Sequence, residues 1–232
     1  MATKKAAETA TQTFVIENIV PKTIIASLEG TSDLILCAKA RSYVREEIFK
    51  QSHPKGTKIP AKYQQPYNLY EKLITSIHWL HPIEFHDDDY SKYTEEEWSR
   101  YMKENQPCIL SNSFAGSMKE AFTSFYKDST GKNNTDLKRS VNIKPITPIT
   151  FDMAGYDQHL AQTSGLSRVN VLTQQNVFSG WRCDLELTYV ETVFPKETII
   201  AILNTAGSNI GVGSRRGEGY GRFTVKSVTE IG

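Results

Sequence analysis

The 232-residue sequence has few cysteines, no long apolar run and almost no net charge, and each shortage excludes a class of protein. The three cysteines are odd in number, far apart and each in an apolar stretch, which suggests buried thiols and neither a disulfide framework nor a Cys-x-x-Cys metal site. No apolar run approaches the length of a bilayer span, and residues 1–8 lack the apolar core of a signal peptide. We therefore expect a cytoplasmic protein with no membrane partner.

The formal net charge of +1 excludes a protein that coats a polyanion through charge excess alone, so any nucleic-acid site must be local. Two nucleotide-binding motifs are also missing. A Walker loop ends in Gly-Lys-Ser or Gly-Lys-Thr, and neither tripeptide occurs. The first three glycines of the densest cluster, Gly211, Gly213 and Gly217, are spaced one residue too widely for the dinucleotide motif G-x-G-x-x-G.

This cluster is the most informative feature that is present. Residues 211–225 contain five glycines together with Arg215, Arg216 and Arg222. Glycines allow close backbone approach and can point N–H groups at an anion, and guanidinium groups bind phosphate bidentately. Tyr220 or Phe223 could stack a base. The alternative interpretation is a glycine-rich hairpin that solves a packing problem, with solvated arginines.

The segments around the loop predict the elements that it joins. Residues 195–207 have a proline at the start, apolar residues at helical spacing and Gly207 as terminator, which predicts a helix. Residues 181–190 alternate apolar and polar side chains, as a strand with one buried face does, and a second strand is predicted over 222–228. Strand, helix, loop and strand in this order form half of a ferredoxin-like unit, and we expect both strands in one antiparallel sheet with the helix on one face.

A second segment, residues 107–121, predicts a short strand followed by a helix that Asn112 or Ser113 caps. The spacing directs Phe114, Met118, Phe122 and Phe125 to the core. Gly116 and Ser117 would lie in the first turn with N–H groups open to a phosphate, and Lys119 would lie just beyond. An ordinary capped amphipathic helix is the alternative.

The glycine-rich loop near the C-terminus resembles that of the RAMP superfamily, the CRISPR-associated RNA-binding proteins. Residues 107–121 are similar to one segment of that superfamily's backbone subunits. In that segment a strand is followed by the motif Pro/Gly-Ser-Ser, a small residue and a helix that contains a lysine. Residues 24–37 resemble the opening of a family of uncharacterised phage and prophage proteins, which also end in a Gly-Arg-Gly-Arg-Phe stretch. The resemblance implies an α+β fold with a ferredoxin-like (RRM-like) antiparallel sheet core, a helical insertion and a C-terminal glycine-rich loop. A phage-encoded member would act in the bacterial host cytoplasm.

The chain as a whole divides into an N-terminal arm and one domain that contains two distinctive segments. Residues 1–13 lack periodicity and predict a mobile arm, and residues 14–232 predict a single domain. Within this domain we expect a helix over 41–50 followed by a helical insertion over about 52–106. The insertion should contain a helix that begins at Pro66 and another that begins with a capping box at 94–97. The polar, turn-rich stretch over about 127–140 predicts a loop or flexible finger.

Catalytic and metal sites have weaker support. His86 and the three aspartates after it form an acidic turn, because consecutive side chains seldom converge on one ion. His53, His78, His81 and His159 lie in no catalytic motif, although any of them could serve as a general base in RNA cleavage. We expect no cofactor, no metal and no catalytic residue.

The leading functional hypothesis is a non-catalytic single-stranded nucleic-acid-binding protein, with RNA favoured over DNA, that assembles side by side with its own copies along the strand. One alternative is a metal-independent endoribonuclease of the same superfamily, and another is a phage structural or assembly protein. The predicted nucleic-acid-binding residues come from both segments: Ser113, Ser117, Lys119, Gly211, Gly213, Ser214, Arg215, Arg216, Gly217, Gly219, Tyr220 and Arg222.

Overall fold

The structure, a computed structural model, describes residues 20–60, 63, 68–162 and 170–231. Its main sheet has four antiparallel strands. The strand order is β10-β1-β9-β5. The strands are β1 (Lys22–Gly30), β5 (Val141–Ile143), β9 (Arg182–Tyr189) and β10 (Phe223–Ile231). The prediction that segments 181–190 and 222–228 share one antiparallel sheet is confirmed, and β1 lies between them.

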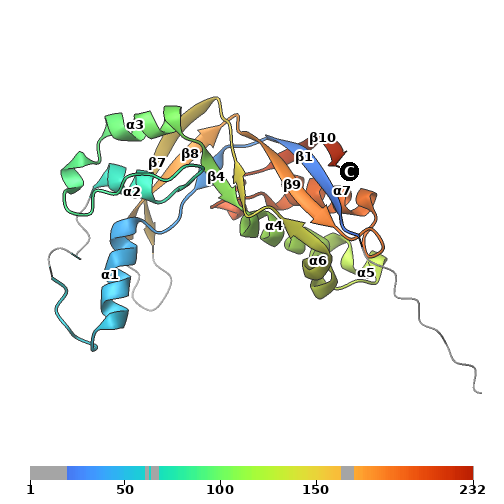
Figure 1. The fold of residues 1–232 in the computed structure, drawn as a ribbon, viewed down its shortest axis with the longest axis horizontal. Helices are drawn as coiled ribbons and strands as arrows, with labels where there is room; N and C mark the ends of the chain where they lie inside the picture. The colour runs from blue at the N-terminus through green and yellow to red at the C-terminus, as the bar shows by residue number, and fades with distance from the viewer. Residues whose placement is uncertain (1–19, 61–62, 64–67, 163–169, 232) are drawn as a thin grey trace, which may run out of the picture.

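Two helices cover one face of this sheet, α4 (Ser111–Phe125) and α7 (Lys196–Thr205) (Figure 1). The alternation in β9 buries Cys183, Leu185, Leu187 and Tyr189 toward them, as the sequence predicts. The chain order β1-α4-β5-β9-α7-β10 is thus a β-α-β unit repeated twice. Burying these side chains in one shared cluster is the main source of stability for the sheet and helices.

Helix α4 buries Phe114, Met118 and Phe122 as predicted, but Phe125 is 56% exposed. Tyr126, directly after the helix, packs toward α7 instead, and its hydroxyl lies in hydrogen-bond contact with Thr205 Oγ1 at 2.7 Å. The fourth core position was therefore predicted one residue too early.

Helix α7 begins directly after Pro195, as expected, but Gly207 does not end it. The chain continues through a wider π turn, Ala206–Ile210, and stops at Gly211, whose φ is +82°. Gly207 is required for a different reason, because a Cβ there would lie 2.3 Å from the carbonyl oxygen of Phe223.

The remaining strands form two small antiparallel sheets. One has the order β2-β8-β7 and the other β3-β4-β6. Their bounds are β2 (Leu34–Leu36), β3 (His78–Trp79), β4 (Pro107–Leu110), β6 (Ile146–Pro148), β7 (Met153–Gln162) and β8 (Asn170–Ser179).

The helices between β2 and β4 have an apolar cluster of their own, made of Leu73, Ile74, Tyr93 and Trp98. The buried Asn176 of β8 ties it to the sheet, accepting from Trp98 Nε1 at 2.9 Å and donating to the Leu73 carbonyl at 2.9 Å. Figure 1 shows these elements at the end of the molecule away from α4 and α6. The elements are α1 (Arg41–Ser52), α2 (Leu69–Thr75), the 3-10 turn η2 (Tyr90–Lys92) and α3 (Glu95–Glu104).

Helix α3 forms half of the predicted capping box. Thr94 Oγ1 accepts from the Glu97 N–H at 3.2 Å, but the Glu97 carboxylate bonds to His86 Nε2 at 2.7 Å instead of returning to the cap. The predicted helix opening at Pro66 lies outside the described residues, and α2 is capped by Asn68.

Residues 127–140 are not the predicted loop but contain two short helices, α5 (Lys127–Thr130) and α6 (Asn134–Ser140). A complete capping box between Asn133 and Asp136 starts α6, and Leu137 is buried against the core. The predicted N-terminal arm over 1–13 lies outside the described residues. Across the described part of the chain, every helix is too short or too polar to cross a bilayer.

Candidate nucleic-acid interface

The glycine-rich loop, residues 211–222, lies against the turn between β1 and β2, and most of its backbone is hydrogen-bonded to the protein. The N–H groups of Ser214 and Gly221 donate to the carbonyls of Ile35 and Asp33, each at 2.8 Å. The Val212 N–H donates across the loop to the Gly221 carbonyl at 2.9 Å. The prediction that the loop offers its N–H groups to a ligand is therefore wrong for these positions, because the protein already satisfies them.

Gly213 and Gly217 differ in what surrounds them. At Gly213 and Gly221 φ is positive, and an added Cβ would lie 2.5 Å and 1.9 Å from backbone oxygens, so close packing accounts for glycine there. Gly217, in the short 3-10 turn η4 (Arg216–Glu218), is different. It is exposed, its φ is not positive, and a Cβ would meet no described atom within 4 Å. Packing within the described chain does not require glycine at this position.

Arg215 is already neutralised by carboxylates. Its Nη1 lies 2.7 Å from Asp157 Oδ2 of β7, its Nε donates to Glu218 Oε1 at 2.9 Å, and its Nη2 contacts Glu218 Oε2. The hydrogen bonds to Glu218 raise the pKa of Arg215 and lower the pKa of Glu218. The predicted phosphate-binding role of Arg215 conflicts with this pairing, which instead joins the loop to β7.

Arg216 and Arg222 are free of such strong pairing. Arg216 Nη1 is 3.5 Å from Glu120 Oε2 of α4, a long contact between half-exposed groups. Arg222 has no carboxylate partner within the described chain. Its Nη2 is 3.5 Å from the Arg216 carbonyl, and its buried Nη1 has no hydrogen-bond partner.

The structure brings the α4 segment against the loop. Ser113 does not cap the helix, which begins at Ser111 without a side-chain cap, and Asn112 does not cap it either. Ser113 Oγ instead accepts a hydrogen bond of 2.8 Å from the Gly213 N–H. The two predicted segments therefore form one continuous surface.

Three other α4 positions differ from one another. Ser117 is completely buried and donates to the Ala206 carbonyl at 3.3 Å, so its side chain is not at the surface. Gly116 lies in the second turn of α4, not the first, so its N–H belongs to the helix. Lys119 is exposed and has no ion pair in the described chain.

The aromatic residues of the loop contribute little stacking surface. Phe223 is completely buried against Phe114 and Trp181, so it cannot stack a base. The Arg215 guanidinium covers one side of the Tyr220 ring at 5.0 Å from its centroid. Only the other side of Tyr220 is left for a ligand.

A pocket of about 230 Å³ lies where the two segments meet. Asn112 and Ser113 of α4 line it together with Gly213 and Ser214 of the loop. His78 of β3 also lines the pocket, and the spacing in the sequence provides no signal that would place His78 there.

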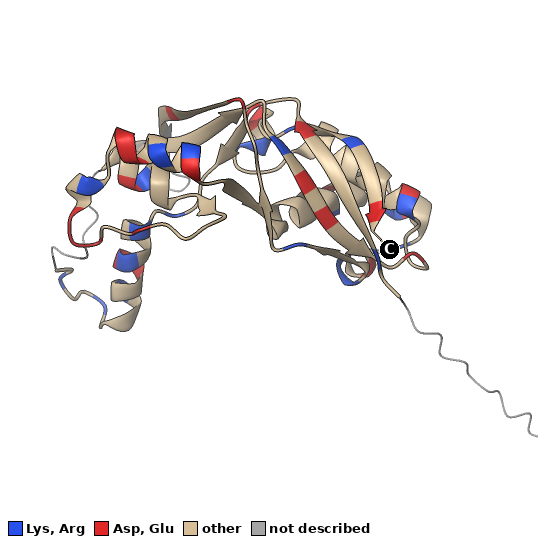
Figure 2. Ribbon diagram, turned by 45° about the horizontal axis from the view of Figure 1, so that its top comes forward, with Lys and Arg blue, Asp and Glu red and all other residues tan. Residues whose placement is uncertain are grey.

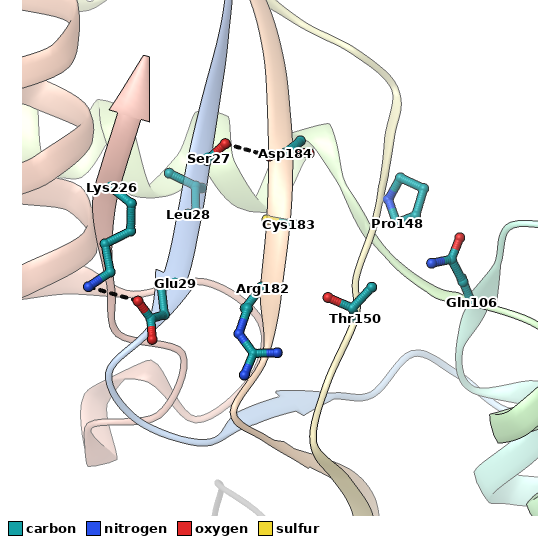
Figure 3. Close-up of a pocket in the computed structure, with 10 residues that line it drawn as sticks. All are labelled: Ser27, Leu28, Glu29, Gln106, Pro148, Thr150, Arg182, Cys183, Asp184 and Lys226. Atoms are coloured by element: carbon teal, nitrogen blue, oxygen red, sulfur yellow. Dashed lines mark hydrogen bonds and ion pairs between the residues drawn. The ribbon is translucent and has the colours of Figure 1, made fainter. Parts of the chain in front are cut away.

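The open face of the main sheet, opposite α4 and α7, has a second kind of pocket (Figure 3). It measures about 430 Å³, and no aromatic side chain is among its lining residues. Its charged side chains all have partners: Lys226 contacts Glu29 at 2.7 Å, Asp184 accepts from Ser27 at 2.7 Å, and Arg182 contacts Asp152, outside the pocket lining, at 2.8 Å. Figure 2 shows acidic residues along these strands. Among the described residues that line this pocket there are neither the stacking rings nor the unpaired cations of a base-binding sheet.

No protein-family model matches the sequence, and no curated protein matches it. Among solved structures, the chain is similar to one in the type III-B Cmr-beta bound to cognate target RNA, with a TM-score of 0.47, 10% identity and 91% of this chain covered. This chain spans 61% of the length of that one. It is also similar to Cmr6 from Pyrococcus furiosus, with a TM-score of 0.39, 12% identity, and coverage of 90% of this chain and 100% of that chain. Both TM-scores are below 0.5.

Proposed function

We propose that this protein binds single-stranded nucleic acid, with RNA as the favoured strand, on the surface formed by the loop and α4. The observation that carries the proposal is that Arg222 has no carboxylate partner within the described chain, where its Nη2 reaches only the Arg216 carbonyl at 3.5 Å. A half-buried cation without a counter-ion is unfavourable, and a phosphate group beside the guanidinium would supply the missing negative charge.

Arg216 and Gly217 support the same proposal. An ion pair as long and as exposed as Arg216 with Glu120 contributes little free energy, so a phosphate can replace Glu120 at low cost. Gly217, next to Arg216, would let the strand approach the backbone at the exposed tip of the loop. These contacts are to phosphate, so we expect affinity to depend on salt and only weakly on base sequence.

We also propose that the core is ferredoxin-like. The β-α-β-β-α-β chain order and the strand order β10-β1-β9-β5 support this assignment. Because the open sheet face carries paired charges, the strand would cross the edge formed by the loop and α4 instead of the sheet face.

The proposal includes assembly of copies side by side along the strand. A near-neutral domain with two or three unpaired cations at its site contacts few nucleotides, so neighbouring copies would be needed for useful affinity. Residues 127–140 do not form the polar finger that the sequence predicted for reaching a neighbour, so assembly rests on the binding argument alone.

Fluorescence anisotropy with a labelled 20-nucleotide RNA, over a range of salt concentrations, tests the binding proposal. The variant Arg216→Ala/Arg222→Ala should weaken binding and reduce the slope of log K against log salt by roughly 1.4, the value for two phosphate contacts on a single strand. The matched control is Lys92→Ala/Lys103→Ala, which removes from the insertion two cations that have no ion pair with any described residue. Equal slopes for the two variants would contradict the proposal.

A second candidate, a metal-independent endoribonuclease, is favoured by one observation. The fold brings His159 of β7 next to the loop, where its Nδ1 lies 2.8 Å from Asp157 Oδ2, the same oxygen that Arg215 contacts. A carboxylate on Nδ1 orients the imidazole and leaves Nε2 to remove a proton from a ribose 2′-hydroxyl. The 2′-oxygen would then attack the adjacent phosphorus to form a 2′,3′-cyclic phosphate, and the 5′-oxygen of the next nucleotide would leave and take up a proton from water.

Incubating labelled RNA with the protein in excess EDTA tests this candidate. Cleavage that is lost in His159→Ala, and that spares the same strand with 2′-deoxyribose, would favour the endoribonuclease. RNA that stays intact with the wild-type protein would contradict the endoribonuclease and leave the proposal of binding without cleavage.

A further inference from the structure

A pocket of about 430 Å³ lies on the other side of α4 from the loop, between α4, α6 and β5. Its buried lining residues are aliphatic: Met118, Leu137 and Ile143 are 2%, 5% and 7% exposed. Its exposed lining residues include Lys119 of α4 and Lys138 of α6. An aliphatic lining beneath two cations suits a ligand that has a flat apolar face and a negative charge.

Neither lysine has an ion pair within the described chain. The nearby carboxylates are engaged elsewhere: Asp136 Oδ2 accepts from the Asn133 N–H at 2.8 Å in the capping box, and Glu120 faces Arg216. By comparison, Lys144, Lys196 and Lys226 at the main sheet each contact a carboxylate within 3.1 Å. Lys119 and Lys138 are therefore available to an anion from outside the chain.

Gly116 provides an independent observation at the same pocket. It lines the pocket from the interior of α4, is exposed, and an added Cβ would meet no described atom within 4 Å. Glycine inside a helix lowers stability relative to alanine by roughly 0.5–1 kcal/mol. Neither backbone conformation nor packing in the described chain accounts for this cost, whereas a ligand that approaches the helix backbone closely would.

We infer that this pocket holds one nucleotide of the bound strand, with the base against the aliphatic lining and its phosphates between Lys119 and Lys138. The inference rests on the proposed nucleic-acid binding and extends it across α4. Asn112 lines both this pocket and the one beside the loop, so the two pockets share a residue at the start of α4. The side-chain amides of Asn112 and Asn134 offer donors and acceptors to a base edge.

A charge-matched pair of variants tests the inference by anisotropy with labelled single-stranded RNA. Lys119→Ala/Lys138→Ala should weaken binding about tenfold and lower the salt slope by roughly 1.4. The control, Lys127→Ala/Lys132→Ala, removes two lysines from the same region that do not line the pocket and have no ion pair among the described residues. It should change affinity less than about twofold because such charges are screened.

Gly116→Gln tests the pocket without changing charge. The longer side chain should fill the space beside α4 and weaken RNA binding, although the helix should become more stable because glutamine is a better helix former than glycine. Lysine-reactive labelling read by mass spectrometry adds a direct measurement: RNA should protect Lys119 and Lys138 more strongly than Lys127 and Lys132.

The outcomes separate the inference from the proposal on which it rests. Wild-type binding that is lost in Arg216→Ala/Arg222→Ala, but weakened equally by both lysine pairs, would overturn the pocket inference and leave the proposed function standing. Wild-type protein that binds no RNA and no DNA would overturn both. Unequal lysine protection together with loss of affinity in Gly116→Gln would support the inference.

Discussion

The backbone N–H of Gly213 donates a hydrogen bond to the side-chain oxygen of Ser113, 2.8 Å away and 100 positions earlier in the chain. This bond joins the glycine-rich loop to the first turn of α4, and so joins the two segments that the sequence marks for nucleic-acid contact. It also explains why Ser113 does not cap its own helix, because its hydroxyl oxygen serves the loop.

Ser113→Ala should therefore lower the free energy of unfolding by about 1 kcal/mol, since it leaves the Gly213 N–H without an acceptor. RNA affinity should fall as well, because the loop loses its anchor on α4. Thermal unfolding and anisotropy measure the two effects, and Ser129→Ala, at an exposed position on α5, is the control. A variant with wild-type stability would show that the bond does not hold the loop.

The contact between Arg215 and Glu218 should make the loop sensitive to acid. The pKa of Glu218 is lowered from 4.5 in the folded protein, so the stabilisation is complete above about pH 4.5 and is lost as the pH falls through the lowered pKa. Glu218→Gln should consequently be less stable than wild type at pH 7 by a difference that shrinks below pH 4.5. Thermal unfolding over this pH range checks the prediction, and a difference independent of pH would contradict it.

Two glycine-to-alanine variants should have opposite consequences. Gly207→Ala places a Cβ 2.3 Å from the Phe223 carbonyl oxygen and should destabilise the fold by roughly 1–3 kcal/mol. Gly217→Ala meets no described atom, so stability should be unchanged while RNA binding weakens. Denaturant unfolding and anisotropy on the same preparations distinguish the two. Full RNA affinity in a stable Gly217→Ala variant would count against strand contact at the loop tip.

Assembly along a strand should be visible by sedimentation. The protein is used at roughly tens of micromolar, the range in which weak self-association is detectable. The complexes should grow as the single-stranded RNA is lengthened, because each added site admits another copy. A monomer with and without a long RNA would refute side-by-side assembly. Arg216→Ala/Arg222→Ala should prevent the growth if RNA contact drives it.

The elements that could be predicted from the sequence are those with local signals. The period-2 pattern of β9 predicted its buried residues, and helical spacing predicted the buried faces of α4 and α7. Helix α6 was missed although its capping box at Asn133 and Asp136 is a local signal, because the polar composition around it favoured a loop.

The candidate site was only partly predictable. Its chemistry, glycines beside arginines, is visible in the sequence, and so is the basic and small-residue character of the α4 segment. The interpretation that the loop offers its N–H groups was wrong for Gly213, Ser214 and Gly221, since their acceptors at Ser113, Ile35 and Asp33 lie 100 or more positions away.

The residue types therefore established which charges and donors the protein has, while the tertiary structure decided which of them remain unpaired. Arg215 and Arg222 are the same residue type in the same loop, so the sequence does not show which of them has a carboxylate partner. Folding places Asp157 of β7 2.7 Å from Arg215, whereas no carboxylate of the described residues pairs with Arg222. An ion pair depends on distance in space, and β7 lies beside the loop only in the folded chain, so no spacing in the sequence could have identified Arg222 as the arginine without a carboxylate partner in the described chain.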